Sequence, residues 1–301
     1  PDLETFKKVV KDVGCAIIGQ TSNLAPADKK LYSIRDIVGT VESLPLITSS
    51  ILSKKIASGL SSLVLDVKVG NGSFNSTIDI ARDLSNSLVR VAKGAGLHCE
   101  AILTDMNQVL GKSAGHTLEI LECIKYIKND FKDHRLEKIT NELISSLLVN
   151  IYKISKEEAY NKINTVINNG LAAEKFEMMV AALGGPKNIL TSYEKDLTNT
   201  SIQKDIFSIE GGWIEKIHTR ELGLILIELG GGRKQVTDKI DYGVGYDNVL
   251  NIGDEVNSST ALLSLYSSKN IDDNLIDKIK GCFIISDKKT QKLSEIFETI
   301  N

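Results

Sequence analysis

The feature that most constrains this chain is a strand–helix–strand pattern in its first hundred residues. Residues 61–69 form an apolar run that turns into alternation, and residues 98–103 are a second apolar run, so both predict buried strands. Residues 76–93 between them repeat apolar side chains at helical spacing, and Ser76 with Asp79 makes a start like a capping box. Strands joined by one helix through short connections run parallel. The pattern therefore predicts a parallel sheet covered by helices.

The rest of the chain divides into a helical middle and a β-rich end. Residues 14–19, which glycines bound, predict a further short buried strand, whereas residues 117–184 are nearly all helical in pattern. Glycines become frequent after about residue 200, and residues 207–216 and 223–229 are strand-like. The predicted fold class is α/β. A partial mixed or parallel sheet domain with helices precedes a C-terminal β-rich α+β domain, with the boundary near residues 190–202.

Composition excludes several classes of protein. The 36 basic and 39 acidic side chains give a net charge of −3, which offers no electrostatic case for binding nucleic acid or an anionic membrane. An apolar fraction of 42% and a charged fraction of 25% exclude a disordered or fibrous chain. No apolar run approaches a transmembrane span and no signal core opens the chain, which favours the cytoplasm. The four cysteines lie far apart without a CxxC pair, so we expect buried, reduced thiols.

A lysine inside an apolar stripe is the most informative local feature. Residues 43–57 predict a helix, and Lys54 falls within its apolar stripe, with Ser50 one turn earlier on the same side. One interpretation is a lysine whose stem covers apolar surface while its amine reaches water. The other is a cationic contact for a ligand in a cleft. Arg35 could join that contact from the preceding segment, or simply pair with Asp36 at the surface.

Polar loops follow the two predicted strands of the sheet. The first is the glycine-rich stretch of residues 66–73, and the second contains Asp105 and Asn107. Ligands of open α/β sheets bind beyond the carboxyl ends of the strands, so both loops are well placed for a site. Each also has an ordinary structural interpretation. Asp66 and Lys68 share one strand face and could pair with each other, and Asp105 or Asn107 could cap a helix.

Two other features carry less information about chemistry. The run of residues 230–234 combines three glycines with two basic side chains, but it lacks the spacing of a P-loop or of a dinucleotide fingerprint. A tight β-turn with exposed bases is the favoured interpretation. The four histidines make no ligand-spaced pair, and no Ser, His and Asp constellation can be argued from the sequence.

Longer stretches of the sequence resemble a known family. The likeness rests on segments that follow one another along essentially the whole chain, namely residues 13–21, 24–30, 35–55, 66–70, 103–108, 230–233 and 241–245. On these segments the chain resembles the thymidine phosphorylase family, with the pyrimidine-nucleoside phosphorylases as near relatives.

The resemblance implies reversible phosphorolysis of thymidine to thymine and 2-deoxyribose 1-phosphate. Phosphate attacks the anomeric carbon while the pyrimidine leaves with developing negative charge, so cationic groups that bind the leaving base would accelerate this step. The family's pyrimidine-binding Arg, Ser and Lys match Arg35, Ser50 and Lys54. Arg35 and Lys54 would act on the base carbonyl and ring nitrogen, and Ser50 would add a hydrogen bond.

Further expectations come with this resemblance. Phosphate is the co-substrate and no cofactor is required, while some relatives bind a cation near the phosphate loop. The matching positions are Leu110 and Ser113, through backbone carbonyl oxygens, and Glu122, whose alternative role is that of a solvated helix glutamate. A homodimer is expected of the full-length family member. Residues 1–25 and 58–195 would form the α/β domain, residues 26–57 a segment of the helical domain, and residues 196–301 the C-terminal domain.

One departure from the family pattern leaves three alternatives. The family's Lys-His-Ser-x-Gly-Gly phosphate loop does not occur in these 301 residues. The chain is therefore expected to be an N-terminally truncated phosphorylase whose own activity is in doubt. A second hypothesis is a non-catalytic remnant that binds a pyrimidine or a protein partner. A third is glycosyl transfer on another nucleotide, which the pyrimidine-binding set argues against.

Overall fold

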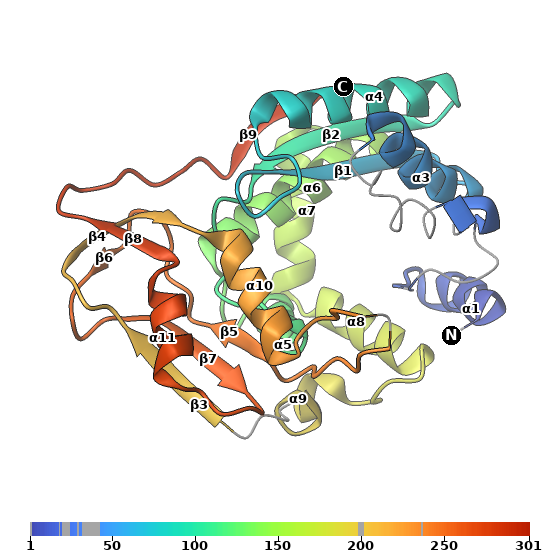
Figure 1. Ribbon diagram of the computed structural model, residues 1–301. Coiled ribbons are helices and arrows are strands. Elements are labelled where there is room, and N and C mark those ends of the chain that lie inside the picture. The colour runs from blue at the N-terminus through green and yellow to red at the C-terminus, as the bar shows by residue number, and fades with distance from the viewer. Residues whose placement is uncertain are drawn as a thin grey trace.

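The protein is described by a computed structural model. It covers residues 2–17, 19, 25–28, 30–31, 43–197, 202–235 and 237–301. Helices and sheets are mixed, and the C-terminal part has its own sheets, in agreement with the predicted α/β fold class. Figure 1 shows the first sheet with its helices on one side of the molecule and the C-terminal sheets on the other.

The first sheet has the strand order β1-β2-β9. Strands β1 (Ser62–Val69) and β2 (His98–Asp105) are parallel and in register from Ser62 opposite His98 to Val69 opposite Asp105, which confirms both predicted strands. Strand β9 (Ile296–Ile300) comes from the end of the chain and pairs antiparallel with β2, placing Ala101 opposite Ile300. The sequence did not predict this pairing, because the apolar run of β2 does not identify which segment of the chain pairs with it.

Helices cover the sheet as the pattern predicts. Helix α4 (Ile78–Gly94) connects β1 to β2 and packs on both strands, while α6 (His134–Tyr152) also packs on β1 and β2. The N-cap of α4 is Thr77 rather than Ser76, since the Thr77 hydroxyl accepts a hydrogen bond from the Ile80 amide. The apolar core between α4 and the sheet includes Leu52, Leu63, Val67, Ala81, Leu88, Cys99 and Leu103.

The other described helices before residue 200 lie near the start of the chain and in its helical middle. They are α1 (Leu3–Val13), α3 (Leu44–Ala57), α5 (His116–Ile127), α7 (Lys156–Asn168), α8 (Leu171–Ala182) and α9 (Ile189–Leu197). Helix α3 packs on α4, and α1 packs on α8 through a small cluster of Val9, Val13 and Met179. Both α3 and the helical character of residues 117–184 agree with the predictions.

The C-terminal part contains two antiparallel sheets around one core. The sheet β3-β7-β5 consists of β3 (Ile202–Phe207), β7 (Ala261–Ser267) and β5 (Gly245–Asp247). The sheet β6-β4-β8 consists of β6 (Glu255–Val256), β4 (Gly212–Ile217) and β8 (Phe283–Ser286). Helices α10 (Thr219–Leu229) and α11 (Asp273–Lys280) complete it. Tyr246, Ile214, Ile217, Leu262 and Leu265 lie in its core.

The predicted strand at residues 14–19 is wrong for the residues of this segment that the structure describes. Residues 14–17 and 19 form no strand, Cys15 is exposed, and the Ile17 side chain is 73% exposed. A strand is stable only when a neighbouring strand accepts its backbone hydrogen bonds. Among the described strands, none pairs with this segment.

Residues 223–229 are helical rather than strand-like. Leu222, Ile225 and Leu229 recur at helical spacing and bury one face of α10. Short apolar runs do not distinguish helix from strand by periodicity, which explains the error. The following glycines form no β-turn between strands. Gly230 ends the helix in a left-handed conformation (φ +106°), and the Gly231 amide donates to the Leu226 carbonyl at 2.8 Å.

The structure bears on two expectations from the sequence, the burial of the cysteines and the lack of a transmembrane span. All four cysteines are free, but only Cys99 and Cys282 are buried, whereas Cys15 and Cys123 are exposed. Predicted burial therefore holds for half of them. Within the described ranges, no helix combines the length and apolar character needed to cross a membrane.

Candidate active site

Helix α3 brings the predicted Ser50 and Lys54 together. The Lys54 ammonium donates to the Ser50 hydroxyl at 3.0 Å, as expected for side chains one turn apart. It also donates to the Asp28 carboxylate at 2.7 Å, a contact between segments 26 residues apart. Ser50 and Asp28 are buried, and the Lys54 side chain is 28% exposed. The Lys54 amine is thus held by two oxygen atoms rather than extended freely into water.

The third predicted base-binding residue, Arg35, lies outside the described residues. The roles of Arg35, Ser50 and Lys54 in binding a pyrimidine therefore stay predictions. Sequence reasoning missed Asp28 as a partner of Lys54. The only local signal was Pro26, which is typical of a first helical turn, and residues 26–28 are helical.

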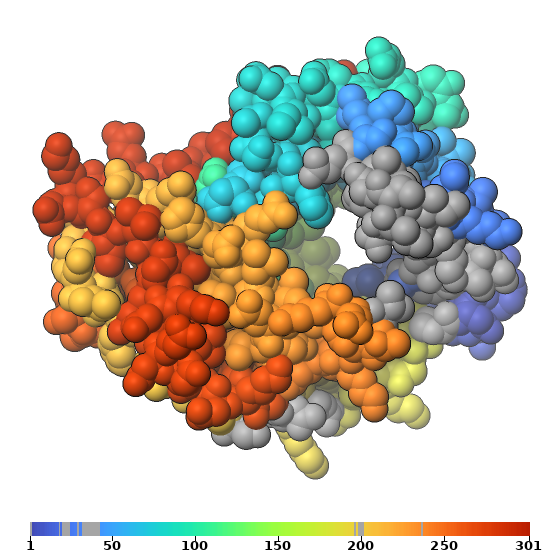
Figure 2. All heavy atoms as spheres, viewed as in Figure 1, coloured from blue at the N-terminus to red at the C-terminus, as the bar shows by residue number. Residues whose placement is uncertain are grey.

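The loop after β1 is fixed to the C-terminal part by asparagine side chains. The Asn71 side-chain amide donates to the Ile217 carbonyl at 2.9 Å, and its oxygen accepts from the Thr219 amide at 2.8 Å. The Thr219 hydroxyl donates to the Asn107 carbonyl at 2.8 Å. Figure 2 shows the loop after β1 (cyan) meeting α10 (light orange) on one face. Gly72 allows this approach, because a Cβ there would lie 2.9 Å from the Thr219 side chain.

The charged residues at the strand ends pair with one another. Lys68 forms an ion pair with Asp66 at 2.7 Å and donates to the Thr104 hydroxyl at 3.1 Å, so the structural interpretation of Asp66 and Lys68 holds. Asp105 is buried and pairs with the buried Arg135 at 3.1 Å. Neither Asp105 nor Asn107 caps a helix, because residues 106–115 form a loop.

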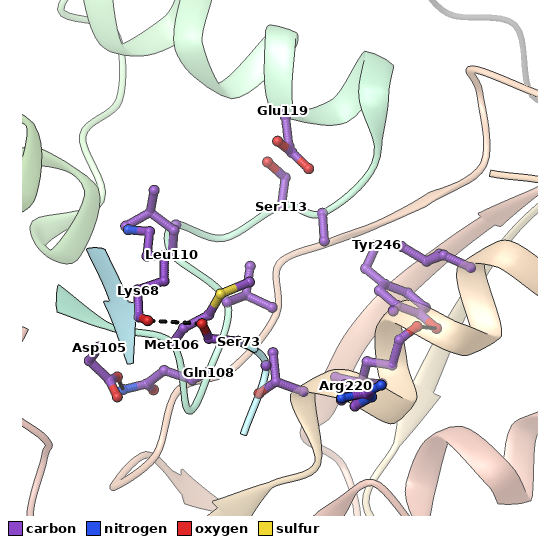
Figure 3. Close-up of a pocket in the computed structure, with 18 of the residues that line it drawn as sticks. Lys68, Ser73, Asp105, Met106, Gln108, Leu110, Ser113, Glu119, Arg220 and Tyr246 are labelled. Carbon is purple, nitrogen blue, oxygen red and sulfur yellow. Dashed lines mark hydrogen bonds between the residues drawn. The ribbon is translucent and has the colours of Figure 1, made fainter. Parts of the chain in front are cut away.

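A cavity of about 600 Å³ lies beyond the carboxyl ends of β1 and β2. Its wall includes Lys68 near the end of β1, Ser73 after β1, Met106 after β2, and Arg220 in α10 (Figure 3). Tyr246 closes one side: it is fully buried, burial raises the pKa of its phenol, and its hydroxyl donates to the Leu222 carbonyl at 3.1 Å. Polar loops at this edge agree with the place expected for a ligand. Ser50 and Lys54 are not among the residues that line it.

The residues predicted to bind a cation do line this cavity. Leu110 and Ser113 lie in the loop after β2, and Glu122 lies in α5. Glu122 is buried, so its interpretation as a solvated glutamate is wrong. Its carboxylate accepts hydrogen bonds from the Lys112 amide at 2.8 Å, from the Ser113 amide at 3.1 Å, and from the Ser113 hydroxyl.

The hydrogen bonds that Glu122 accepts bear on whether Leu110, Ser113 and Glu122 could bind a cation. Three donors already stabilise the Glu122 carboxylate, so its burial needs no metal ion. No group of three His, Cys, Asp or Glu side chains with the geometry of a metal site occurs among the described residues. The donor set would offer one carboxylate and two carbonyls, which is an oxygen-only set suited to a hard cation. The cation stays a prediction.

The chain is similar in sequence to known protein families and to a known protein. The model of the glycosyl transferase family, a/b domain, matches residues 1–173, which is more than half of the chain. The chain belongs to this glycosyl transferase family. The pyrimidine nucleoside phosphorylase C-terminal domain model matches residues 213–286 of this family member. A thymidine phosphorylase from Colwellia psychrerythraea (strain 34H) is 48% identical over 268 residues, which cover 89% of this chain. The chain spans 61% of the length of that relative.

Proposed function

We propose that the protein takes part in reversible phosphorolysis of pyrimidine nucleosides, with thymidine as the first substrate to test. The observation that carries the proposal is the amine of Lys54, held between Ser50 and Asp28 in a segment that resembles the family's base-binding helix. The relative that is 48% identical bears the name thymidine phosphorylase, and both family models point to the same chemistry. Phosphate is the co-substrate, and no organic cofactor is part of the reaction.

The reaction places its charge where Lys54 can act. An oxygen of phosphate forms a bond to the anomeric carbon of the sugar as the bond from that carbon to the pyrimidine nitrogen breaks. The electron pair of the broken bond stays on the base and spreads to its ring carbonyl oxygens. An ammonium that donates a hydrogen bond to the departing base stabilises this charge more in the transition state than in the substrate. We propose this role for Lys54 and Arg35, with Ser50 as a hydrogen-bonding partner of the base.

The two remaining site assignments belong to the same proposal. We place the cation, where one is bound, at Leu110, Ser113 and Glu122, beside the cavity rather than beside Lys54. We also propose a cytoplasmic protein that acts as a homodimer in its encoded length. The oxygen-only character of the cation set favours Mg²⁺, Ca²⁺ or a monovalent cation over a transition metal.

The experiment is release of thymine from thymidine with and without inorganic phosphate. It is run on the 301-residue chain and on the encoded protein with any in-frame sequence that precedes residue 1. We expect phosphate-dependent release by the encoded protein and little or none by the 301-residue chain, since the family's phosphate loop is not within it. Inosine, a purine nucleoside, serves as the control substrate and should not be cleaved.

Two outcomes would contradict parts of this proposal. Absence of phosphate-dependent release by the encoded protein, together with measurable thymine binding, would favour the non-catalytic pyrimidine-binding alternative. Full turnover by the 301-residue chain would show that the missing loop is not needed for phosphate. Calorimetric titration with thymine distinguishes these cases, because it requires only the base-binding residues.

A further inference from the structure

The Lys54–Asp28 pair differs from the other lysine ion pairs of the protein. Among the lysine–carboxylate pairs that the structure describes, Asp28 is the most buried carboxylate, with 8% of its side chain exposed. The comparable pairs Lys138–Glu295 and Lys156–Glu142 have carboxylates that are 12% and 14% exposed and lysines that are about half exposed. Lys54 is only 28% exposed. Both partners of this pair are therefore largely removed from water.

A largely buried ion pair is poor evidence for a gain in stability. The desolvation of a carboxylate and an ammonium is unfavourable and can exceed their attraction, so stability alone does not account for a buried pair. A free lysine side chain also has many rotamers, whose entropy is lost when the side chain is held in one conformation. A partner that holds the lysine side chain in one conformation before a ligand binds reduces the conformational entropy that is lost on binding. Asp28 has the position to be such a partner.

The geometry at the ammonium leaves a donor for a ligand. An ammonium has three hydrogens. In the described part of the protein, one is donated to Asp28 at 2.7 Å and one to Ser50 at 3.0 Å. Two bonds to oxygen atoms on separate segments fix the position of the nitrogen and the direction of its third hydrogen. The segment of residues 26–28 and helix α3 thus define one orientation of the Lys54 amine.

We propose that Asp28 is the positioning residue of Lys54: it fixes the ammonium so that its remaining hydrogen is directed at the leaving pyrimidine. This inference rests on the proposed function for its substrate, while the contact itself rests on the structure alone. Asp28 does not touch the base or the phosphate in this role and is not a catalytic residue. The loss of this contact should lower turnover through Lys54.

The test is a double-mutant cycle on the encoded protein with Asp28→Asn, Lys54→Ala and the double variant. Asparagine keeps the volume of Asp28 and one acceptor oxygen, so the fold is preserved while the charge is removed. We expect Asp28→Asn to lower kcat for thymidine about tenfold or more and to leave KM for phosphate unchanged. In the Lys54→Ala background it should have no further effect, because coupled residues are not additive. Asp28→Glu, which keeps the charge, should recover part of the loss.

A matched control separates positioning from a general effect on the fold. Glu142→Gln removes a carboxylate that is 14% exposed and lies 2.6 Å from the Lys156 amine, on helix α6. It should leave kcat unchanged in the wild-type background and in the Lys54→Ala background. Equal losses from Asp28→Asn and Glu142→Gln would overturn the proposal. So would an Asp28→Asn loss that adds fully to that of Lys54→Ala.

A binding experiment tests the role of Asp28 independently of turnover. Calorimetric titration with thymine should show about tenfold weaker binding for Asp28→Asn, for Lys54→Ala and for the double variant, with no additional loss in the last. If the wild type binds thymine but releases none from thymidine, the proposed function fails while this pattern still supports Asp28. Unchanged thymine affinity in Asp28→Asn beside weakened affinity in Lys54→Ala would overturn the role of Asp28 alone.

Discussion

Ser50 and Lys54 lie four positions apart, and this one turn of α3 decides the geometry of the candidate base-binding group. The serine hydroxyl lies 3.0 Å from the lysine amine; Ser50 is buried, and the Lys54 side chain is 28% exposed. The neighbouring Lys55 follows on the same helix and has no hydrogen bond to either residue among those described. Two adjacent lysines thus have different surroundings, which makes them a natural pair for comparison.

Replacement of Lys54 by alanine should lower turnover of thymidine about 100-fold or more. The reason is loss of one donor to the leaving base, by analogy with loss of a single oxyanion-hole donor. Steady-state kinetics of the encoded protein measure the effect, and Lys55→Ala is the control, for which we expect turnover close to wild type. Equal effects of the two substitutions would return Lys54 to the interpretation of a lysine that only covers apolar surface.

The buried Asp105–Arg135 pair should matter for stability rather than for chemistry. Both side chains are almost completely buried, and Asp105 also accepts hydrogen bonds from Asn107 and Gln108. Asp105→Ala leaves the Arg135 charge without its partner, so we expect a loss of about 3–5 kcal/mol in the free energy of unfolding. Urea unfolding measures this. The exposed carboxylate of Asp79, which pairs with Arg82, serves as the control, and Asp79→Ala should leave the midpoint nearly unchanged.

At the scale of single elements, the start of α4 distinguishes two neighbouring hydroxyl side chains. The sequence pattern favoured Ser76 as the cap, whereas the structure shows Thr77 in extended conformation with its hydroxyl bonded to the Ile80 amide. Thr77→Ala should therefore destabilise the protein by about 1 kcal/mol, and Ser76→Ala should have little effect. Thermal unfolding of the two variants decides between them. A larger loss for Ser76→Ala would restore the predicted capping box.

The elements that the sequence predicted correctly support one another in order along the chain. Helix α4 repeats its apolar residues at helical spacing over 17 residues, and β1 and β2 lie on either side of it in the strand–helix–strand pattern; all three are confirmed. Residues 14–19 and 223–229 are short apolar runs, for which composition alone cannot supply a hydrogen-bonding partner or a period. Strand β9 was missed for a related reason, since pairing with β2 is decided by tertiary contact.

The candidate site was predictable to the extent that it is local. Ser50 and Lys54 lie one turn apart, so their contact follows from helical geometry. Asp28 reaches Lys54 from another segment, and no spacing rule connects residues 26 positions apart. The cavity at the strand ends was expected from the topology, but its closure by Tyr246 and Arg220 depends on how the C-terminal part packs.

At the scale of the whole molecule, side-chain contacts hold the two halves together. Asn71 and Thr219 link the loop after β1 to α10, and Gln108 accepts a hydrogen bond from the Ile252 amide at 2.8 Å. Ala114 and Tyr246 add backbone hydrogen bonds between the halves. Cys99 in the first half and Cys282 in the second are buried thiols, so the ionisation of each depends on whether its half is folded.

These thiols predict how stability depends on alkaline pH. Burial raises the pKa of Cys99 to about 11 and that of Cys282 to about 11, above the value of an unfolded chain. The pKa of each thiol is higher in the folded state than in the unfolded state. The contribution of the buried thiol to the free energy of unfolding is therefore complete below the unfolded pKa, and it is lost as the pH rises towards the folded pKa. We expect the free energy of unfolding to fall between about pH 9 and pH 11, by on the order of 2 kcal/mol for each thiol.

Urea unfolding at pH 8 and at pH 10.5 measures this loss. Cys99→Ala and Cys282→Ala should each make the free energy of unfolding less sensitive to pH, whereas Cys15→Ala, at an exposed position, should not. The same pH dependence in all three variants would assign the alkaline loss to other groups. Tyr126, whose pKa burial raises to about 12, would then be the next candidate.

Strand β9 joins the first sheet late in translation. Its partner β2 ends at Asp105, whereas β9 begins at Ile296. About two hundred residues must be added in between, which takes roughly 10–40 s at ordinary rates of translation. Throughout that interval none of the strands that the structure describes lies beside this edge of β2. A nascent chain therefore exposes a pairing-competent edge until Ile296–Ile300 emerge from the ribosome, and earlier release of the chain would leave that edge open to other chains.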